Sequence, residues 1–323
     1  KEKIFQVPDS TVYRTNDEFA TRQAYGNAVA SLAEKNDKVI CLDAEVSNST
    51  NTLEVKKVKP KQFIESYIAE QNMIGMATGL SVKGYKVFAS TFGAFLTRAH
   101  DQIRMAALSN ANLTICGSHA GVSIGEDGAS QMALDDIAMM RGIPNSVIFY
   151  PSDAVSTEKL VFLSGELPGI KYIRTTRPKT RVLYDINEQF QLGDFKILKQ
   201  SKEDKIVLAG SGITVHESLK AYEQIKKEKI NSSVIDIYSI KPFNKEKFID
   251  FVKSRGGKVI ISEDHFAEGG IGEMISSLIV NTDIKLICLN IKEIPHSGKK
   301  EELLEKYRIN AKAIAEEAKK LLE

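Results

Sequence analysis

Short apolar runs alternate with amphipathic segments along almost the entire chain. Runs such as VICLD, KVFAST, LTICGS and KVIISED are rich in β-branched residues, and the segments between them carry apolar residues at helical spacing. Strands that alternate with helices form parallel sheets, because each crossover helix packs back onto the sheet. The pattern therefore predicts an α/β fold with mainly parallel sheets flanked by helices.

The first half of the pattern predicts a series of strands and the helices between them. The expected strands are KVICLD, FIESYIA, YKVFAST, NLTICGS, SVIFY and KYIRT. The expected helices lie near residues 17–35, after Glu70, near residues 92–109, in SQMALDDIAMMR and in the segment that PSDAVSTEK opens. Ser152 or Asp153 can cap the last of these helices, since side-chain oxygens satisfy free amides at a helix start.

The alternation loosens after TTRPKT and then resumes. Turn residues and hairpin-like pieces fill RVLYDINEQFQLGDFKILKQSKED, and KIVLAGSG, SSVIDIYS, KVIISED and IKLICLN then alternate with helical segments again. We therefore expect two domains. The expected boundaries are an N-terminal extension (1–14), a first domain (15–180), a linker (181–192) and a smaller second domain (193–323).

The charge balance argues against a nucleic-acid partner. The formal net charge is +2 over 323 residues, and acids and bases are mixed along the chain, whereas a nucleic-acid footprint needs a strong basic excess. The compact basic stretch VKKVKPKQ is interpreted as a solvated loop. No apolar run approaches the roughly 18 residues that span a bilayer, and KEKIFQVPDS lacks the apolar stretch of a signal peptide. We expect a soluble cytoplasmic protein without membrane contacts.

The cysteines indicate the same compartment. Cys41, Cys116 and Cys288 each lie in a strand-like run, and their spacing fits no zinc motif. We interpret them as buried reduced thiols and expect no metal site on this chain.

The stretch SYIAEQNMIGMATG places an acid, Glu70, where an expected strand gives way to an apolar helix. Lone acids at such positions are often caps or surface groups. Ligands of open α/β sheets, however, bind at the carboxyl ends of strands, and a helix start keeps a carboxylate ionised. Both interpretations are open from position alone.

Two aromatic residues and an arginine follow the next expected strand. Phe92, Phe95 and Arg98 are three residues apart in STFGAFLTRAHDQIR, so they share one face of a helix. This spacing suits core packing, and it equally suits an aromatic wall on which a flat heterocycle stacks.

A glycine-rich loop, CGSHAGVSIGEDGASQ, follows the strand LTICGS and concentrates polar residues. It carries His119, Glu126, Asp127 and Gln131. Glycines let a backbone turn tightly and approach a ligand, and loops after strands often carry the chemistry of a site. His119 is either a structural histidine or a catalytic one.

Further candidates are scattered basic and hydroxyl residues, Arg22, Ser49 and Arg177. Guanidinium groups match phosphate oxygens through a planar fork of donors, although each residue alone also fits an ordinary surface position. The glycine patterns AGSGITV and EGGIGE lack the dinucleotide fingerprint and are interpreted as strand-to-helix turns. His265 in SEDHFAEGG is interpreted as a packing or interface residue.

Taken together, several motifs resemble the transketolase family. YIAEQNM, STFGAFLTRAHDQIRMAALS, GSHAGVSIGEDGASQMALDD, FYPSDAVSTEK and IRTTRP resemble its pyrimidine-binding domain in order and spacing over nearly all of residues 15–180. SIKPF, EDHFAEGGIGE and SGKKEELL resemble its C-terminal domain. The resemblance implies a domain that binds thiamine diphosphate, followed by a transketolase C-terminal domain.

The resemblance also implies a catalytic role for Glu70. The matching glutamate in the family hydrogen-bonds the aminopyrimidine of thiamine diphosphate and favours the imino tautomer that takes up the thiazolium proton. A two-carbon glycolaldehyde unit then passes from a ketose phosphate to an aldose phosphate, a reaction of the pentose phosphate pathway. The cofactor is the electron sink, and the protein supplies orientation and proton traffic.

Other roles follow from the same resemblance. It implies that Phe95 stacks on the pyrimidine with Phe92 behind it, and that Arg98 and Gln131 also adjoin the cofactor. It implies that His119, also catalytic, and Asp127 hold the hydroxyls of the donor sugar, and that the phosphate end is bound by Arg22, Ser49 and Arg177. Two positions depart from yeast-type members, which have His at Gln131 and an aromatic residue at Arg98. Glu45 replaces an Asp that is common in the family near the dimer interface.

A larger departure concerns the other half of the cofactor. Transketolases bind the diphosphate and magnesium through an N-terminal domain with a Gly-Asp-Gly motif, and neither GEDG nor LGDF is that motif. We therefore expect the C-terminal subunit of a split transketolase, with Mg²⁺ or Ca²⁺ on a separate N-terminal subunit, in a two-plus-two heterotetramer. The alternatives are a β subunit of a 2-oxo-acid dehydrogenase, a deoxyxylulose phosphate synthase, and a catalytically silent binding or regulatory subunit.

Overall fold

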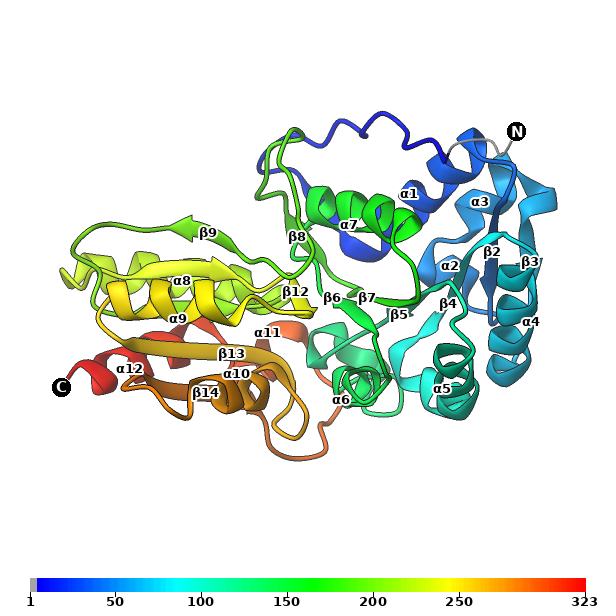
Figure 1. Ribbon diagram of the computed structural model, residues 1–323. Coiled ribbons are helices and arrows are strands. Elements are labelled where there is room, and N and C mark those ends of the chain that lie inside the picture. Colours follow the sequence, from blue (N-terminus) through cyan, green and yellow to red (C-terminus); the bar gives the residue numbers. More distant parts are fainter. Residues whose placement is uncertain (1–4) are drawn as a thin grey trace.

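The computed structural model describes residues 5–323, which form two α/β domains side by side (Figure 1). The first domain is built on a seven-stranded sheet with the order β12-β6-β7-β5-β4-β2-β3, in which β12 is antiparallel and the other strands are parallel. Its strands are β2 (Val39–Asp43), β3 (Phe63–Glu65), β4 (Lys86–Phe92), β5 (Leu113–Ser118), β6 (Val147–Phe149), β7 (Ile170–Arg174) and β12 (Ser239–Lys241).

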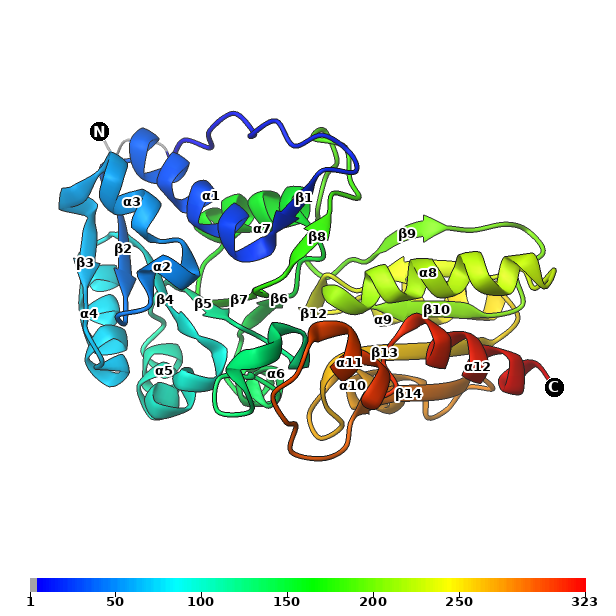
Figure 2. The same ribbon diagram turned by 180° about the vertical axis from the view of Figure 1, so that it is seen from behind.

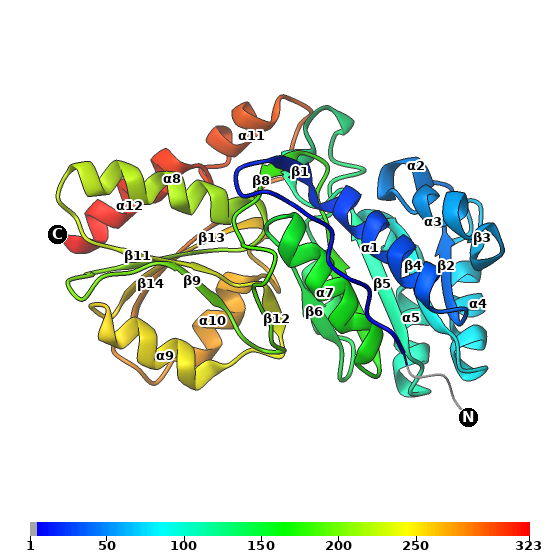
Figure 3. The same cartoon turned by 90° about the horizontal axis from the view of Figure 1, so that it is seen from above.

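Helices cover both faces of this sheet because its strands alternate their apolar side chains between the two faces. Val39 and Cys41 of β2 point to a core that α1 (Thr21–Lys35) and α7 (Ala154–Glu166) close. Ile40 and Leu42 point to the opposite core, which includes side chains of α4 (Glu70–Val82), α5 (His100–Leu108) and α6 (Asp136–Arg141). Figure 3 shows α1 and α7 side by side along one face of the sheet.

The second domain has a five-stranded sheet with the order β14-β13-β10-β11-β9, of which only β9 is antiparallel. Its strands are β9 (Lys196–Lys199), β10 (Val207–Gly210), β11 (Ser233–Asp236), β13 (Lys258–Phe266) and β14 (Lys285–Ile291). The helices α8 (Ile213–Lys227) and α12 (Ala311–Leu322) share a core on one face (Figure 2). The other face packs on α9 (Lys245–Ser254) and α10 (Ile271–Ile279).

Shorter elements complete the described part of the chain. They are β1 (Glu18–Ala20), which pairs with β8 (Lys179–Arg181), the helices α2 (Ser47–Thr50), α3 (Leu53–Val58) and α11 (Lys300–Lys306), and the 3₁₀ segments η1 (Pro60–Gln62), η2 (Gly93–Ala99) and η3 (Val122–Asp127).

The α/β architecture with mainly parallel sheets is thus confirmed. Both doubtful glycine patterns are strand-to-helix turns as predicted, since α8 begins at Ile213 and α10 at Ile271, within the two patterns. Of the two proposed caps it is Asp153 that accepts a hydrogen bond from the Ser156 amide, at 2.8 Å. Cys41 and Cys116 are buried, Cys288 is half-buried, and all three are free thiols.

Several expected boundaries are wrong. The strand FIESYIA ends at Glu65, because Tyr67 adopts φ 53° and Ile68 is 77% exposed, so the chain leaves the sheet there. The basic stretch is not a loop but the end of α3 and η1, anchored by the buried Val55.

Several expected helix starts are also too early in the sequence. The first helix begins at Thr21, since residues before it pair with β8. The helix expected in SQMALDDIAMMR begins only at Asp136, and the helix near 92–109 divides into η2 and α5. In each case a strand pairing or tertiary contact overrides local helical spacing.

The sheet of the first domain also contains a strand from the second half of the chain, which no local pattern predicts. β12 lies in the second half of the chain, yet it pairs with β6 of the first domain. The junction next to it is held by a buried carboxylate: Asp236 Oδ2 accepts hydrogen bonds from Ser152 Oγ at 2.6 Å and from Tyr184 OH at 2.7 Å. Burial raises the pKa of Asp236 to about 7.

This raised pKa predicts how stability depends on pH. Between the usual value of 3.8 and about 7 the folded chain retains a proton on Asp236 that the unfolded chain releases, so the free energy of unfolding falls as pH rises through this window. Asp236→Asn removes this contribution while keeping an oxygen that accepts both hydroxyls. We expect the decrease between pH 5 and pH 7 to become smaller by about 2 kcal/mol, measured by urea unfolding at both pH values.

The matched control for this experiment is Asp283→Asn, which changes an exposed aspartate in a turn. It should leave the pH dependence of unfolding as in the wild type. Equal slopes for wild type and Asp236→Asn would contradict the assignment of this titration to Asp236.

Candidate functional site

Candidate residues gather where parallel strands of the first sheet end. β2, β4 and β5 run parallel as neighbours, so their carboxyl ends meet at one edge. Asp43 and Phe92 are the last residues of β2 and β4, and His119 directly follows β5. Open α/β sheets bind ligands at this edge.

Glu70 is the first residue of α4 and is only 4% exposed. Its Oε1 accepts a hydrogen bond from Arg98 Nη1 at 2.9 Å. Within residues 5–323 no hydrogen bond reaches Oε2. The start of a helix favours a carboxylate because the free amides and the helix dipole are positive there. Glu70 Oε2 is therefore available to a ligand.

A row of stacked planar groups leads from Glu70 to His119. The Arg98 guanidinium lies over the Phe95 ring at 4.9 Å, and the rings of Phe95 and Phe92 stack at 5.0 Å. Phe92 in turn stacks on the His119 imidazole at 3.9 Å with an interplanar angle of 16°. The predicted common face of Phe92, Phe95 and Arg98 is real, although η2 has the three-residue turn of a 3₁₀ helix, which aligns residues three apart.

His119 sits in the glycine-rich loop (119–128) with a left-handed φ of 57°. Its side chain is buried, and Nδ1 lies 3.0 Å from Ser118 Oγ, while Nε2 lies 3.9 Å from Asp127 Oδ2. Burial and the positive charges of Arg22 and Arg177 lower the pKa of His119 to about 3. The imidazole is therefore neutral at neutral pH.

The two arginines form the far end of this row. Arg22 donates from Nη1 to the Ser49 carbonyl at 2.8 Å and from Nε to the Arg177 carbonyl at 3.4 Å. Arg177 Nη1 lies 3.2 Å from Asp127 Oδ1. Burial and the neighbouring Arg177 lower the pKa of Arg22. The structure thus brings Arg22, Ser49, Asp127 and Arg177 together, although Ser49 contributes its backbone rather than its hydroxyl to Arg22.

Gln131 stands apart from these contacts. It is half-buried, and its Oε1 accepts a hydrogen bond from Ser130 Oγ at 2.5 Å. In the described part of the chain no hydrogen bond or ring contact joins it to Glu70, Phe95 or His119. Its expected place at the cofactor stays a prediction.

Sequence reasoning missed Asp43, which positions the segment that carries Ser49. Asp43 Oδ2 accepts hydrogen bonds from the hydroxyls of Thr50 and Thr52 at 2.6 and 2.8 Å, and Oδ1 accepts from the Val46 amide at 2.7 Å. Burial raises the pKa of Asp43 to about 6. An acid that ends a strand was the available signal, the same signal that marked Glu70.

It also missed Asp264, which holds the glycine-rich loop from the second domain. Asp264 Oδ1 accepts a hydrogen bond from the Val122 amide at 2.7 Å, and Oδ2 accepts from the Ser123 amide at 3.3 Å. Gly121 has φ 80°, and a Cβ there would lie 2.0 Å from Asp264 Oδ2. Asp264 lies 142 residues away in sequence, so no local pattern could reveal this contact.

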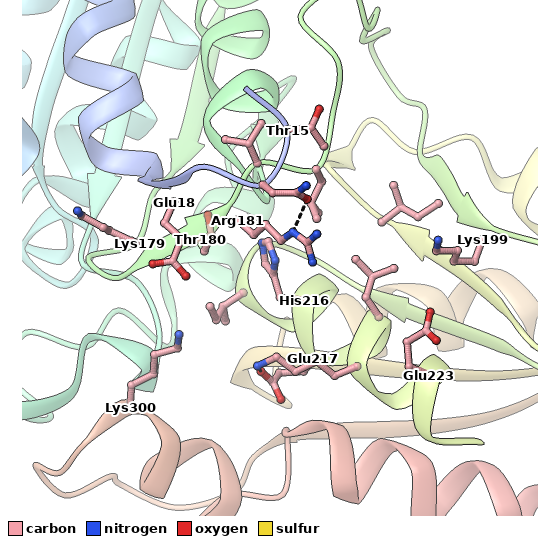
Figure 4. Close-up of a pocket in the computed structure, with 17 residues that line it drawn as sticks. Thr15, Glu18, Lys179, Thr180, Arg181, Lys199, His216, Glu217, Glu223 and Lys300 are labelled. Atoms are coloured by element: carbon pink, nitrogen blue, oxygen red, sulfur yellow. Dashed lines mark hydrogen bonds and ion pairs between the residues drawn. The ribbon is translucent and has the colours of Figure 1, made fainter. Parts of the chain in front are cut away.

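A cavity of about 530 Å³ lies between the domains, and none of the predicted site residues lines it. Figure 4 shows the residues around it, among them Lys179 and Arg181 of β8, His216 of α8 and Lys300 of α11. His216 Nε2 lies 2.7 Å from the Ser152 carbonyl, and burial lowers its pKa to about 4. His216 is therefore a neutral packing residue of the domain junction.

Metal-ion sites and membrane-spanning helices are two further features to consider. Over residues 5–323, no group of three or more His, Cys, Asp or Glu side chains is arranged to hold a metal ion. The same part of the chain contains no helix with the length and apolarity needed to cross a membrane.

Comparison with known families defines the class to which this fold and site belong. The family described as "Transketolase, pyrimidine binding domain" matches residues 17–182, and "Transketolase, C-terminal domain" matches residues 195–314. The structure thus contains these two domains in the order in which their matches follow one another along the chain. The chain belongs to the transketolase family.

Relatives and solved structures agree with this family. The chain is 47% identical to human transketolase over 319 residues, which is 98% of this chain and 51% of the human protein. It is 49% identical to "Transketolase-like protein 2" from Mus musculus over 305 residues, or 94% of this chain and 49% of that protein. The chain therefore spans about half the length of the curated relatives it matches.

Two solved structures are similar to the whole chain. One is described as "Split gene transketolase, inactive beta4 tetramer", with a TM-score of 0.86 and 33% identity, covering 94% of this chain and 98% of that one. The other, the transketolase from Campylobacter jejuni, has a TM-score of 0.80 and 20% identity, covering 95% of this chain and 47% of that one. At 20% identity, the second similarity shows a shared fold alone.

The contact between Asp264 and the loop leads to a prediction. Asp264→Asn places an amide NH₂ against one of the two backbone N–H groups, so that a charge-assisted hydrogen bond is lost and the glycine-rich loop opens more often. We expect the amides of Val122 and Ser123 to exchange with deuterium about 10 to 100 times faster, since such a hydrogen bond contributes roughly 1.5–3 kcal/mol. Hydrogen–deuterium exchange with mass spectrometry of peptides over residues 116–131 measures this.

The control is Asp250→Asn, which changes an exposed aspartate of α9 far along the second domain. Its exchange in residues 116–131 should equal that of the wild type. If Asp264→Asn exchanges at the wild-type rate in this segment, Asp264 does not hold the loop.

Proposed function

We propose that this chain supplies the pyrimidine-binding and substrate-binding half of a thiamine diphosphate-dependent transketolase. The reaction transfers a two-carbon glycolaldehyde unit from a ketose phosphate to an aldose phosphate, as in the pentose phosphate pathway. The observation that carries the proposal is the continuous row from Glu70 through Arg98, Phe95 and Phe92 to His119. It joins a buried carboxylate at one end to a cluster of sugar- and phosphate-binding groups at the other.

The residues around Glu70 fit the aminopyrimidine of thiamine diphosphate. Glu70 Oε2 accepts no hydrogen bond in the described residues, and a flat heterocycle can stack on the half-buried Phe95 in place of the exposed Arg98 guanidinium that lies over its ring. When bound, the cofactor supplies the electron sink for cleavage of a carbon–carbon bond. Glu70 holds a ring nitrogen and shares a proton with it, Phe92 supports Phe95, and Arg98 and Gln131 adjoin the ring.

The other end of the row suits a phosphorylated sugar. His119 and Asp127 hold the hydroxyls of the donor, and the phosphate end is bound by Arg22, Arg177 and the segment of Ser49. Burial is the main cause of the lowered pKa of His119, and a bound phosphate would offset only the part that the Arg22 and Arg177 charges contribute.

The cofactor's diphosphate and its Mg²⁺ or Ca²⁺ are assigned to a partner, an N-terminal transketolase subunit, in a heterotetramer with two copies of this chain. In support, this chain covers 98% of a structure described as a split gene transketolase in an inactive β4 tetramer. That neighbour supports both self-association and association with another subunit.

Replacement of Glu70 tests the catalytic assignment. In a complex with the partner, thiamine diphosphate, Mg²⁺ and a ketose phosphate donor, Glu70→Gln keeps the size of the side chain and loses the carboxylate. We expect two-carbon transfer to fall at least about 100-fold, the lower end of what a positioned acid–base group contributes. Transfer is measured as the appearance of the aldose phosphate product.

Glu246→Gln, on the exposed start of α9, is the matched control and should retain wild-type activity. Undiminished transfer by Glu70→Gln would sink the catalytic role of this residue. A wild-type complex that assembles without any transfer would instead support the catalytically silent alternative.

The partner requirement has its own test. This chain without a partner is expected to give no two-carbon transfer, and activity should rise with added N-terminal subunit until the two chains are equimolar. Assay of transfer across a titration, with sedimentation analysis of the same mixtures, measures both quantities. Transfer by this chain alone would refute the division of the cofactor site between two chains.

A further inference from the structure

A cavity of about 440 Å³ lies where the second domain meets the arginines of the proposed phosphate site. Arg22, Arg177 and Glu126 line it from the first domain. Lys299, Lys300 and Glu301, at the start of α11, line it from the second domain. The cavity is therefore shared between the two domains, and the resemblance to known site residues covers only its first-domain side.

The segment that leads into the two lysines packs closely against the glycine-rich loop. A Cβ on Gly125 would lie 3.1 Å from the Gly298 carbonyl oxygen, and a Cβ on Gly128 would lie 2.6 Å from Ser297 Oγ. Beneath this contact Ile124 and Leu303 belong to one apolar cluster that joins the domains. The lysine backbone is thus held against the glycine-rich loop.

The charges on the cavity wall favour an anion. Four cationic side chains face two carboxylates there. Arg177 is near Glu126 at 3.6 Å, and Lys300 is 3.9 Å from Glu301, whereas Lys299 forms no ion pair within the described residues. The lining thus carries two positive charges in excess, which matches a phosphate dianion rather than a neutral hydroxyl end.

We propose that Lys299 and Lys300 bind the phosphate of the sugar substrate, so that the second domain takes part directly in substrate selection. This inference rests on the proposed function, because it names further residues of the same substrate site. Lys300 also lines the larger interdomain cavity, where Figure 4 shows it extending from α11 toward the first domain. Lys299 lines only the smaller cavity of the two.

The test compares a phosphorylated donor with an unphosphorylated one. The assembled complex is assayed with a ketopentose 5-phosphate and with the same ketopentose lacking phosphate, for wild type, Lys299→Gln, and the double variant Lys299→Gln/Lys300→Gln. We expect kcat/KM for the phosphorylated donor to fall, through KM, about tenfold in Lys299→Gln and about 100-fold in the double variant, as for the loss of one and of two charge-assisted hydrogen bonds. Values for the unphosphorylated donor should stay within about twofold.

Two further variants separate charge from structure. Lys299→Arg keeps the positive charge and should restore kcat/KM to within about threefold of wild type, since a guanidinium also binds phosphate. Lys312→Gln, on the exposed face of α12, removes an equivalent charge away from the cavity and should change neither donor.

The outcomes distinguish this inference from the function on which it rests. Equal kcat/KM losses for both donors, or no loss for either, in an active complex would overturn only the role of the lysines. A wild-type complex that transfers no two-carbon unit would overturn the proposed function and this inference with it.

Discussion

The buried ion pair between Arg174 and Asp136 is the interaction on which both the domain junction and the site depend. Arg174 Nε donates to Asp136 Oδ2 at 2.8 Å, and both side chains are fully buried. Arg174 Nη2 also donates to the carbonyls of Ala133 and Asp264, at 2.8 and 2.9 Å. One guanidinium therefore fixes the segment after the glycine-rich loop and the β13 strand of the second domain at the same time.

This arrangement explains why charges are kept in the interior at all. Burial of two ions costs several kcal/mol each, and only good geometry with further hydrogen bonds offsets it. Here Tyr172 OH adds a 2.6 Å bond to Asp136, and the Arg174 guanidinium lies 4.5 Å from the centre of the Tyr150 ring. Although burial alone would raise it, the Arg174 charge lowers the pKa of Asp136. The network gives the two domains one relative position, and Asp264 relays that position to the loop.

The fold and the first-domain side of the site could be predicted from sequence because their signals are local. Glu70 was marked by the change from strand to helix, and Phe95 and Arg98 by a three-residue spacing that a 3₁₀ helix preserves. Asp264 and Lys299 carried no such signal. Their contacts join segments more than a hundred residues apart, and only the packing of the second domain brings them together.

The same limit applies to the ends of secondary-structure elements. A periodic pattern shows which residues suit a strand or a helix, and it does not show which strand lies beside which. FIESYIA has the composition of a strand, but the strand that it forms, β3, is only three residues long. The chain leaves the sheet before Tyr67, which has φ 53°. β12 lies within residues 193–323, which the pattern assigns to the second domain, because pairing between strands of different domains leaves no trace in spacing.

β12 has a consequence for how such a protein can be divided. It completes the edge of the first sheet next to β6, and a chain cut between the two domains would leave β6 with unpaired backbone groups along its length. Exposed strand edges recruit strands from other molecules. The second part of the chain is therefore needed to cover the β6 edge of the first sheet, and the two domains depend on each other for it.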